Sequence, residues 1–192
     1  IFKSKNKKFL KESSLNLTNL MNKRQFNNLV LLNYVPQLDK FLFWAQQLIA
    51  ESLGKKGRGF LPIISPAPKD HHSLLQLYLD GKKDKIFYIF SQDKNRNKKI
   101  KLKSQENILN FYKYKNLNQI KEAQTNAIIK SFKNKQIPFR EFKIKAINEQ
   151  TLGELFSYFM VETVITGRLA NINPFDQPAV EKVKEDTKKL LS

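Results

Sequence analysis

The sequence contains no cysteine among its 192 residues. This excludes disulfide bonds and thiolate metal ligands, and it fits a reducing compartment, so we expect a cytoplasmic protein. No apolar run is long enough to span a membrane, and the first residues do not resemble a signal peptide. Because the chain starts with Ile1 rather than methionine, we expect a fragment of a longer chain.

Acidic residues are also few, with 17 Asp and Glu against 35 Lys and Arg, which gives a formal net charge of +18. Such a charge is found in nucleic-acid-binding proteins. Here the lysines are spread along the whole chain, and only "KNRNKKIKLK" (94–103) is a dense basic run, which we interpret as a solvated loop and strand start. The sequence has no zinc-finger spacing, aromatic RNA-binding motif or basic zipper. We therefore expect neither nucleic acid nor a membrane as a partner.

The apolar residues, 41% of the chain with 15 Phe, are enough for a packed core and change their spacing in a regular way. Short strand-like runs alternate with segments of helical spacing, one of which Gly54 ends. The pattern predicts an α/β fold: a parallel sheet of about five strands with helices on both faces, and extra C-terminal helices. The expected strands lie at 27–34, 59–66, 84–92 and 139–147, and the later helices at 70–80, 117–134, 151–170 and from 178 onward.

The two histidines, His71 and His72, stand side by side where the helix at 70–80 begins. We expect Asp70 to cap this helix and both imidazoles to lie in its first turn. Neighbours on a helix point about 100° apart, so at most one ring can face a given ligand. The helix dipole favours a neutral ring that can exchange a proton, but from this segment alone two ordinary polar first-turn residues are the favoured interpretation. A zinc site would need a third ligand.

Glu51 lies at the end of the helix that precedes "SLGKKG". The negative end of a helix dipole destabilises a carboxylate anion, which makes it a better base if water is excluded. A solvent-facing glutamate is the usual alternative. The following "GKKGRG" lacks the spacing of a phosphate-binding P-loop.

The stretch "NPFDQPAVEKVKEDTKKL" is the third candidate, and Pro178 is placed in it like a first helical residue. Gln177 and Lys184 are seven positions apart, close to two helical turns, so both can face the same way. Val180 would lie on another face and pack. The alternative is an ordinary surface lysine on a C-terminal helix.

Together these stretches resemble the phosphoglucose isomerase family, over nearly the whole chain and in the same order. The resemblance is carried by "AESLGK" (50–55), "HHSLLQLYLDG" (71–81), "TLGELF" (151–156) and "GRLANINPFDQPAVEKVK" (167–184). It implies an α/β protein with two flavodoxin-like sugar-isomerase (SIS) domains. Residues 1–150 would be the second SIS domain, and residues 151–192 a helical extension that completes the active site. The first SIS domain would be absent from this chain.

The resemblance also implies a reaction and its residues. The family interconverts glucose 6-phosphate and fructose 6-phosphate, an aldose–ketose isomerisation through a cis-enediol in glycolysis and gluconeogenesis. Glu51 would move the proton between C2 and C1, and His72, rather than His71, would assist ring opening. Lys184 would act near the ring oxygen and Gln177 would contact the substrate. No metal or cofactor is implied, and members are homodimers in which the histidine reaches into the partner's site.

The sequence departs from the family in several places. A Ser/Thr-rich phosphate loop and an arginine that stabilises the enediolate belong to the missing first SIS domain, so we expect little or no activity from this chain alone. The late helix has Phe159, Met160 and Val161 where relatives often read Tyr-Glu-His, and Pro178 replaces a residue that is often aromatic. A non-catalytic SIS module that binds a phosphosugar is the alternative. The joint presence of Glu51, His72 and Lys184 favours the enzyme, because a sensor needs no proton transfer.

Overall fold

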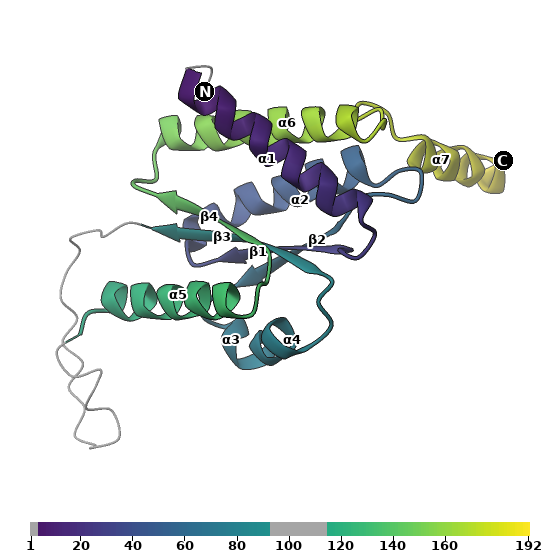
Figure 1. Ribbon diagram of the computed structural model, residues 1–192. Coiled ribbons are helices and arrows are strands. Elements are labelled where there is room, and N and C mark those ends of the chain that lie inside the picture. Colours follow the sequence, from purple (N-terminus) through teal and green to yellow (C-terminus); the bar gives the residue numbers. More distant parts are fainter. Residues whose placement is uncertain (1–3, 93–114) are drawn as a thin grey trace.

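The sheet has its two most apolar strands at its centre (Figure 1). The computed structural model describes residues 4–92 and 115–192, so the basic run at 94–103 lies outside the described residues. Within these ranges four strands pair in parallel in the order β2-β1-β3-β4. Their bounds are β1 Asn28–Asn33, β2 Leu61–Pro66, β3 Lys85–Gln92 and β4 Phe139–Ile144. The parallel α/β class is confirmed, with four described strands against the expected number of about five.

The positions of the strands follow from their sequences. β1 ("NLVLLN") and β3 ("KIFYIFSQ") are buried along nearly their full length, as central parallel strands covered on both faces must be. β2 contains two prolines, Pro62 and Pro66, which cannot donate to a neighbour and so favour an edge. β4 ("FREFKI") mixes charged and apolar residues, is only partly buried, and forms the other edge.

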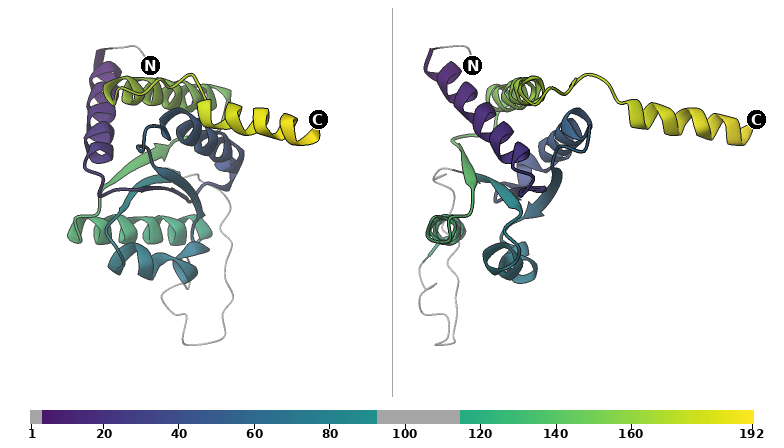
Figure 2. Two further views of the ribbon diagram at one scale, coloured as in Figure 1. Left: turned by 90° about the vertical axis from the view of Figure 1, so that its right-hand side faces the viewer. Right: turned by 45° about the vertical axis from the view of Figure 1, so that its right-hand side comes forward.

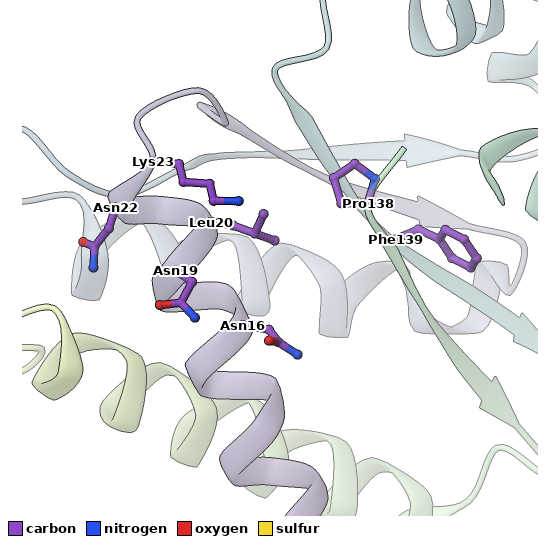
Figure 3. Close-up of a pocket in the computed structure, with 7 residues that line it drawn as sticks. All are labelled: Asn16, Asn19, Leu20, Asn22, Lys23, Pro138 and Phe139. Atoms are coloured by element: carbon purple, nitrogen blue, oxygen red, sulfur yellow. The ribbon is translucent and has the colours of Figure 1, made fainter. Parts of the chain in front are cut away.

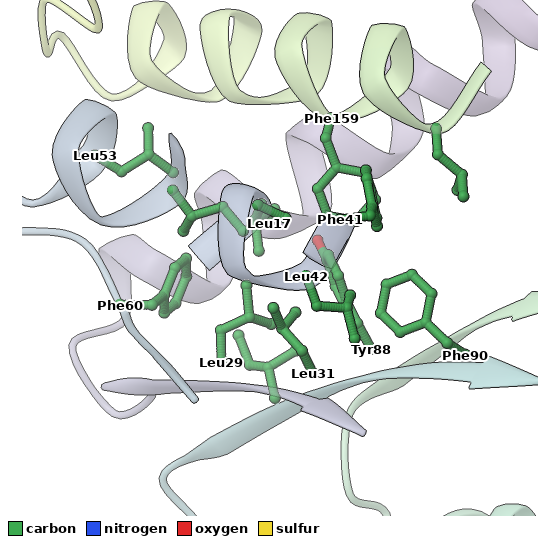
Figure 4. Packing of buried hydrophobic residues seen from close by; sticks show 14 of the residues in the cluster. Leu17, Leu29, Leu31, Phe41, Leu42, Leu53, Phe60, Tyr88, Phe90 and Phe159 are labelled. Atoms are coloured by element: carbon green, nitrogen blue, oxygen red, sulfur yellow. The ribbon is translucent and has the colours of Figure 1, made fainter. Parts of the chain in front are cut away.

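Helices cover both faces of the sheet, as expected (Figures 1 and 2). One face carries α1 Ser4–Asn22, α2 Asp39–Leu53 and α6 Glu149–Leu169, and the other carries α3 Asp70–Ser73, α4 Leu75–Asp80 and α5 Leu117–Asn134. A short 3-10 turn, Pro36–Leu38, leads into α2. The larger core lies under the first group, where Phe41 of α2 and Phe159 of α6 meet above Tyr88 and Phe90 of β3 (Figure 4).

The helix expected at 70–80 is broken into α3 and α4 at Leu74, whose φ of −122° and ψ of −13° are not helical. The expected cap by Asp70 is also wrong. Its carboxylate accepts from the hydroxyls of Ser65 (2.8 Å) and Ser73 (3.2 Å), while Lys69 takes the N-cap position. Ser65 is fully buried at the end of β2, so its hydroxyl needs an acceptor, and Asp70 supplies it.

The last helix, α7 (Pro178–Leu191), points away from the rest of the described chain (Figure 2). Pro178 is its first residue, as predicted. None of its residues is buried, and Val180 and Val183 are 43% and 65% exposed. The expectation that Val180 packs is therefore wrong within the described residues.

Candidate active site

Glu51 lies in the last turn of α2 and is partly buried. Phe41, Leu42, Ala45 and Ile49 fix this helix on the sheet through one apolar stripe, which leaves Glu51 on a different face. Its Oε1 accepts a hydrogen bond from Gln47 Nε2 (3.0 Å) and its Oε2 accepts one from Gln177 Nε2 (2.9 Å). Both donors are neutral amides, so they orient the carboxylate without pairing it to a cation. Solvent is not fully excluded from it.

Gln177 reaches Glu51 because the chain turns back at the end of α6. Asn171 has a φ of 56°, and the amides of Asn171 and Ile172 donate to Arg168 O (3.1 Å) and Gly167 O (2.8 Å). This is a Schellman motif, with the buried Ile172 as its apolar contact.

The last turn of α6 also lies close to its neighbours. A Cβ on Gly167 would lie 3.3 Å from the Cβ of Pro174, which is tight, and 3.5 Å from Leu53 Cδ2, so this turn packs closely against Pro174 and the end of α2. The two motifs that carry Glu51 and Gln177 are 126 positions apart in sequence, and the structure brings them together.

The two histidines lie at α3 and have different surroundings. His71 Nε2 lies 2.6 Å from the hydroxyl of Tyr34, and the two rings meet edge to face. Burial lowers the pKa of His71, and the charge of His72 lowers it further, which favours a neutral ring. His72 is exposed. The packed ring is therefore His71, the residue expected to be the structural neighbour, and His72 is free to face a ligand.

Within this chain Glu51 and His72 lie near opposite ends of β2. Five residues before Glu51, Gln46 Nε2 donates to Pro62 O (2.8 Å) at the start of β2, whereas His72 follows the end of the same strand. Six residues of β-strand span about 17 Å. The two side chains thus cannot serve one site in a single copy of the chain.

Lys184 is not brought to Glu51. It lies on α7, its side chain is 60% exposed, and its Nζ contacts Glu181 Oε1 at 2.9 Å. Gln177 precedes this helix with a φ of −142°, so the argument from two helical turns does not apply to this pair.

A wide groove of about 700 Å³ lies between the end of α1 and the start of β4 (Figure 3). Its lining consists of Asn16, Asn19, Leu20, Asn22, Lys23, Pro138 and Phe139, and none of the four predicted site residues contributes to it.

In the described ranges no three His, Asp or Glu side chains are grouped so as to hold a metal ion. No helix of the described chain is both long and apolar enough to cross a membrane.

The sequence interpretation missed a buried polar network beneath α1. Glu162 accepts from Arg140 Nη1 (2.7 Å), Tyr158 OH (3.0 Å) and Tyr88 OH (3.3 Å), and the hydroxyl of Ser13 also donates to it. The available signal was a lone carboxylate in the largely apolar stretch "SYFMVETVI". A buried charge needs partners, and here they come from α1, β3, β4 and α6.

These features define a parallel α/β domain in which a carboxylate at a helix end meets a glutamine from a distant C-terminal segment. No protein-family model matches the chain. It is 37% identical over 163 residues to a probable glucose-6-phosphate isomerase of Methanococcus maripaludis and 36% identical over 173 residues to the glucose-6-phosphate isomerase of Methanocaldococcus jannaschii. These matches cover 85% and 90% of the chain but only 36% and 42% of the relatives, so the chain spans about two fifths of their length.

Solved structures share the fold. A hypothetical protein from Thermus thermophilus matches 93% of the chain and 45% of its own length, with a TM-score of 0.80 at 25% identity. A glucose-6-phosphate isomerase from Chlamydia trachomatis matches 86% of the chain and 35% of its own length, with a TM-score of 0.70 at 18% identity. The chain belongs to the glucose-6-phosphate isomerase family, as the resemblance predicted.

Proposed function

We propose that this chain supplies the catalytic base, Glu51, of a glucose-6-phosphate isomerase that interconverts glucose 6-phosphate and fructose 6-phosphate. The observation that supports this most directly is the hydrogen bond between Glu51 and Gln177, which joins two motifs of the family. Because the chain spans about two fifths of its relatives, the activity belongs to the whole enzyme. We expect little or no turnover from these 192 residues alone, and a cytoplasmic location remains a prediction.

The proposed reaction is a proton transfer between neighbouring carbons. In the open-chain aldose, the hydrogen on C2 is weakly acidic because the C1 carbonyl stabilises the resulting enediolate. Glu51 removes this proton and returns it to C1, while a proton moves between the two oxygens, which leaves a ketone at C2. Positioning accounts for much of the efficiency of such a base, and the amides of Gln47 and Gln177 hold the carboxylate in one orientation.

We further propose that the enzyme is a homodimer in which His72 assists ring opening at the partner's site. Two observations support this role: His72 is exposed, and it lies near the opposite end of β2 from Glu51 of its own chain. The role of Lys184 near the ring oxygen rests on the motif at 167–184 alone.

Replacing Glu51 by Gln in the complete enzyme tests this function. The amide keeps the shape of the side chain but cannot take up a proton, so we expect turnover of fructose 6-phosphate to fall by roughly 10²- to 10⁴-fold while the sugar phosphate still binds. A coupled assay measures turnover, and titration calorimetry measures binding.

Glu154→Gln is the matched control, because Glu154 accepts from Gln150 on the surface of α6 as Glu51 does from Gln47 on α2. We expect this variant to retain the activity of the unmodified enzyme. Turnover of Glu51→Gln within about tenfold of the control would exclude Glu51 as the base. Binding of the sugar phosphate without turnover in the unmodified complete protein would instead indicate the non-catalytic sensor.

A further inference from the structure

The segment "GKKGRG", which we call the basic loop (Gly54–Gly59), connects α2 to β2 and matches no phosphate-binding motif. Each of its three cations donates instead to a backbone carbonyl at or just after the end of α6. The contacts are Lys55 Nζ to Asn173 O (2.6 Å), Lys56 Nζ to Asn171 O (3.1 Å) and Arg58 Nη1 to Ala170 O (2.7 Å). The basic loop thus holds the segment that leads to Gln177.

The backbone of the basic loop is folded tightly onto the end of α2. Gly59 has a φ of +105°, and a Cβ at this position would lie 2.8 Å from Leu53 O and 2.9 Å from Gly54 Cα. No other residue type fits here without moving the backbone. The loop is therefore fixed relative to Glu51, which lies three residues before Gly54.

Electrostatics explain why cations suit this place. The contacted carbonyls, of Ala170, Asn171 and Asn173, lie just beyond α6, beside the negative end of its dipole, where Lys and Arg side chains are favourable. Lys55 is the most enclosed, with only 11% of its side chain exposed, and it also pairs with Asp176 Oδ1 at 3.0 Å. Through this hydrogen bond Lys55 lowers the pKa of Asp176. Asp176 in turn accepts from Asn173 Nδ2 (2.9 Å), which closes the turn before Gln177.

We propose that the basic loop positions Gln177 against Glu51, and that Lys55 is the main positioning residue. Lys55 lies four residues after Glu51, and its partners Asn173 and Asp176 lie within the four residues before Gln177. One ammonium therefore joins the two segments that carry the pair. The structural part of this proposal stands on these contacts. Its consequence for turnover rests on the proposed function of Glu51.

Hydrogen exchange in the 192-residue chain tests the structural part. In Lys55→Met, which removes the charge and keeps much of the length, we expect amides in residues 170–177 to exchange roughly tenfold faster, because a charged hydrogen bond at an enclosed site is lost. Lys55→Arg should restore most of the protection. Lys40→Met, at an exposed lysine in the first turn of α2, is the matched control and should leave these amides unchanged.

If Lys55→Met does not fold, Asp176→Asn serves as the second variant, because it weakens the ion pair at a half-exposed side chain and leaves the bond from Lys55 to Asn173 in place. We expect a smaller, roughly threefold increase in exchange over the same amides. If amides 170–177 exchange at the parent's rate in whichever of these variants folds, the positioning role of Lys55 is overturned, independently of whether Glu51 is the catalytic base.

A double-mutant cycle in the complete enzyme tests the catalytic part. If Lys55 acts through Gln177, Lys55→Met should lower kcat roughly tenfold in the unmodified enzyme but have little further effect in a Gln177→Ala background. Additive losses would show that Lys55 does not act through Gln177 and would overturn the positioning role. Failure of Glu51→Gln to lower turnover would remove the proposed function and leave the exchange result untouched, so the two failures are distinguishable.

Discussion

Glu51 and Glu162 lie on two helices, α2 and α6, that share one core, yet their carboxylates have opposite surroundings. Glu162 is 2% exposed, pairs with Arg140 and accepts from three hydroxyl groups. Glu51 is partly exposed and accepts from two neutral amides. A glutamate in a helix sequence thus becomes either a structural anion or a candidate base, depending on its donors.

The two carboxylates differ because Glu162 is paired with a cation, whereas Glu51 accepts hydrogen bonds from two neutral amides. A guanidinium beside a carboxylate stabilises its charge strongly, and burial of the pair makes removal of either partner costly. Burial alone would lower the pKa of Arg140, but the phenol of Tyr88 and the carboxylate of Glu162 raise it overall, so Arg140 stays charged. Neutral amides fix the direction of a carboxylate without placing a cation beside it. Glu162 therefore suits the core, and Glu51 suits a site.

The largest expected effect is on stability. Glu162→Leu leaves the guanidinium of Arg140 enclosed without its carboxylate, and breaking such a buried pair costs about 3–5 kcal/mol. In a chain of this length we expect Tm to fall by roughly 10 °C in thermal unfolding followed by circular dichroism. The matched variant Glu51→Leu, on the neighbouring helix, should stay within about 0.5–1 kcal/mol of the parent. If Tm falls equally in Glu162→Leu and Glu51→Leu, the two carboxylates do not differ in their contribution to stability.

We expect a smaller loss of stability when both Arg140 and Glu162 are replaced. Arg140→Met combined with Glu162→Leu removes the two charges together and fills the space with apolar atoms, so we expect it to recover more than half of the stability that Glu162→Leu loses. The hydroxyls of Tyr88 and Tyr158 lose an acceptor in this variant, so full recovery is not expected. If the double variant unfolds at the same temperature as Glu162→Leu, the unpaired guanidinium is not the cause of the loss.

Much of the fold could be predicted from the sequence because its strands and most of its helices carry strong local patterns. The apolar runs of β1 and β3 and the helix at 117–134 are confirmed, the last with bounds Leu117–Asn134. α1 was not predicted, although Leu10, Leu17 and Met21 recur at helical spacing, because polar residues dominate the segment and its apolar stripe is narrow. The break at Leu74 was missed because no glycine or proline marks it.

The candidate site was only partly predictable, because its key contact joins residues far apart in the chain. The motifs indicated Glu51 and Gln177, and the structure adds how they meet: the Schellman motif at Asn171 and the cations of the basic loop. Neither feature has a local signature, since an asparagine just after a helix C-cap and a Gly/Lys-rich loop are common in many folds. For Lys184 the sequence argument does not apply. The seven-residue spacing from Gln177 to Lys184 indicates a shared face only if both residues are helical, and Gln177 lies outside the helix.

The two histidines also differ in their surroundings, since His71 is packed against Tyr34 and His72 is exposed. The smallest effect that we expect is on how Tm depends on pH. Burial and the neighbouring His72 lower the pKa of His71 in the folded chain, and Asp70 opposes this only in part. The unfolded chain, with a histidine pKa of about 6.5, therefore takes up the proton first as the pH falls.

Stability from His71 is thus fully present above about pH 6.5 and is lost below it, through the window down to the folded pKa. Because the side chain is only partly buried, we expect Tm of the parent chain to fall by only about 1–2 °C more than that of His71→Gln between about pH 7 and pH 5. His72→Gln, at the exposed neighbour, should retain the pH dependence of the parent. If Tm falls equally with pH in the parent and in His71→Gln, burial of this ring does not link its protonation to folding, and the distinction between the packed histidine and the exposed one is weakened.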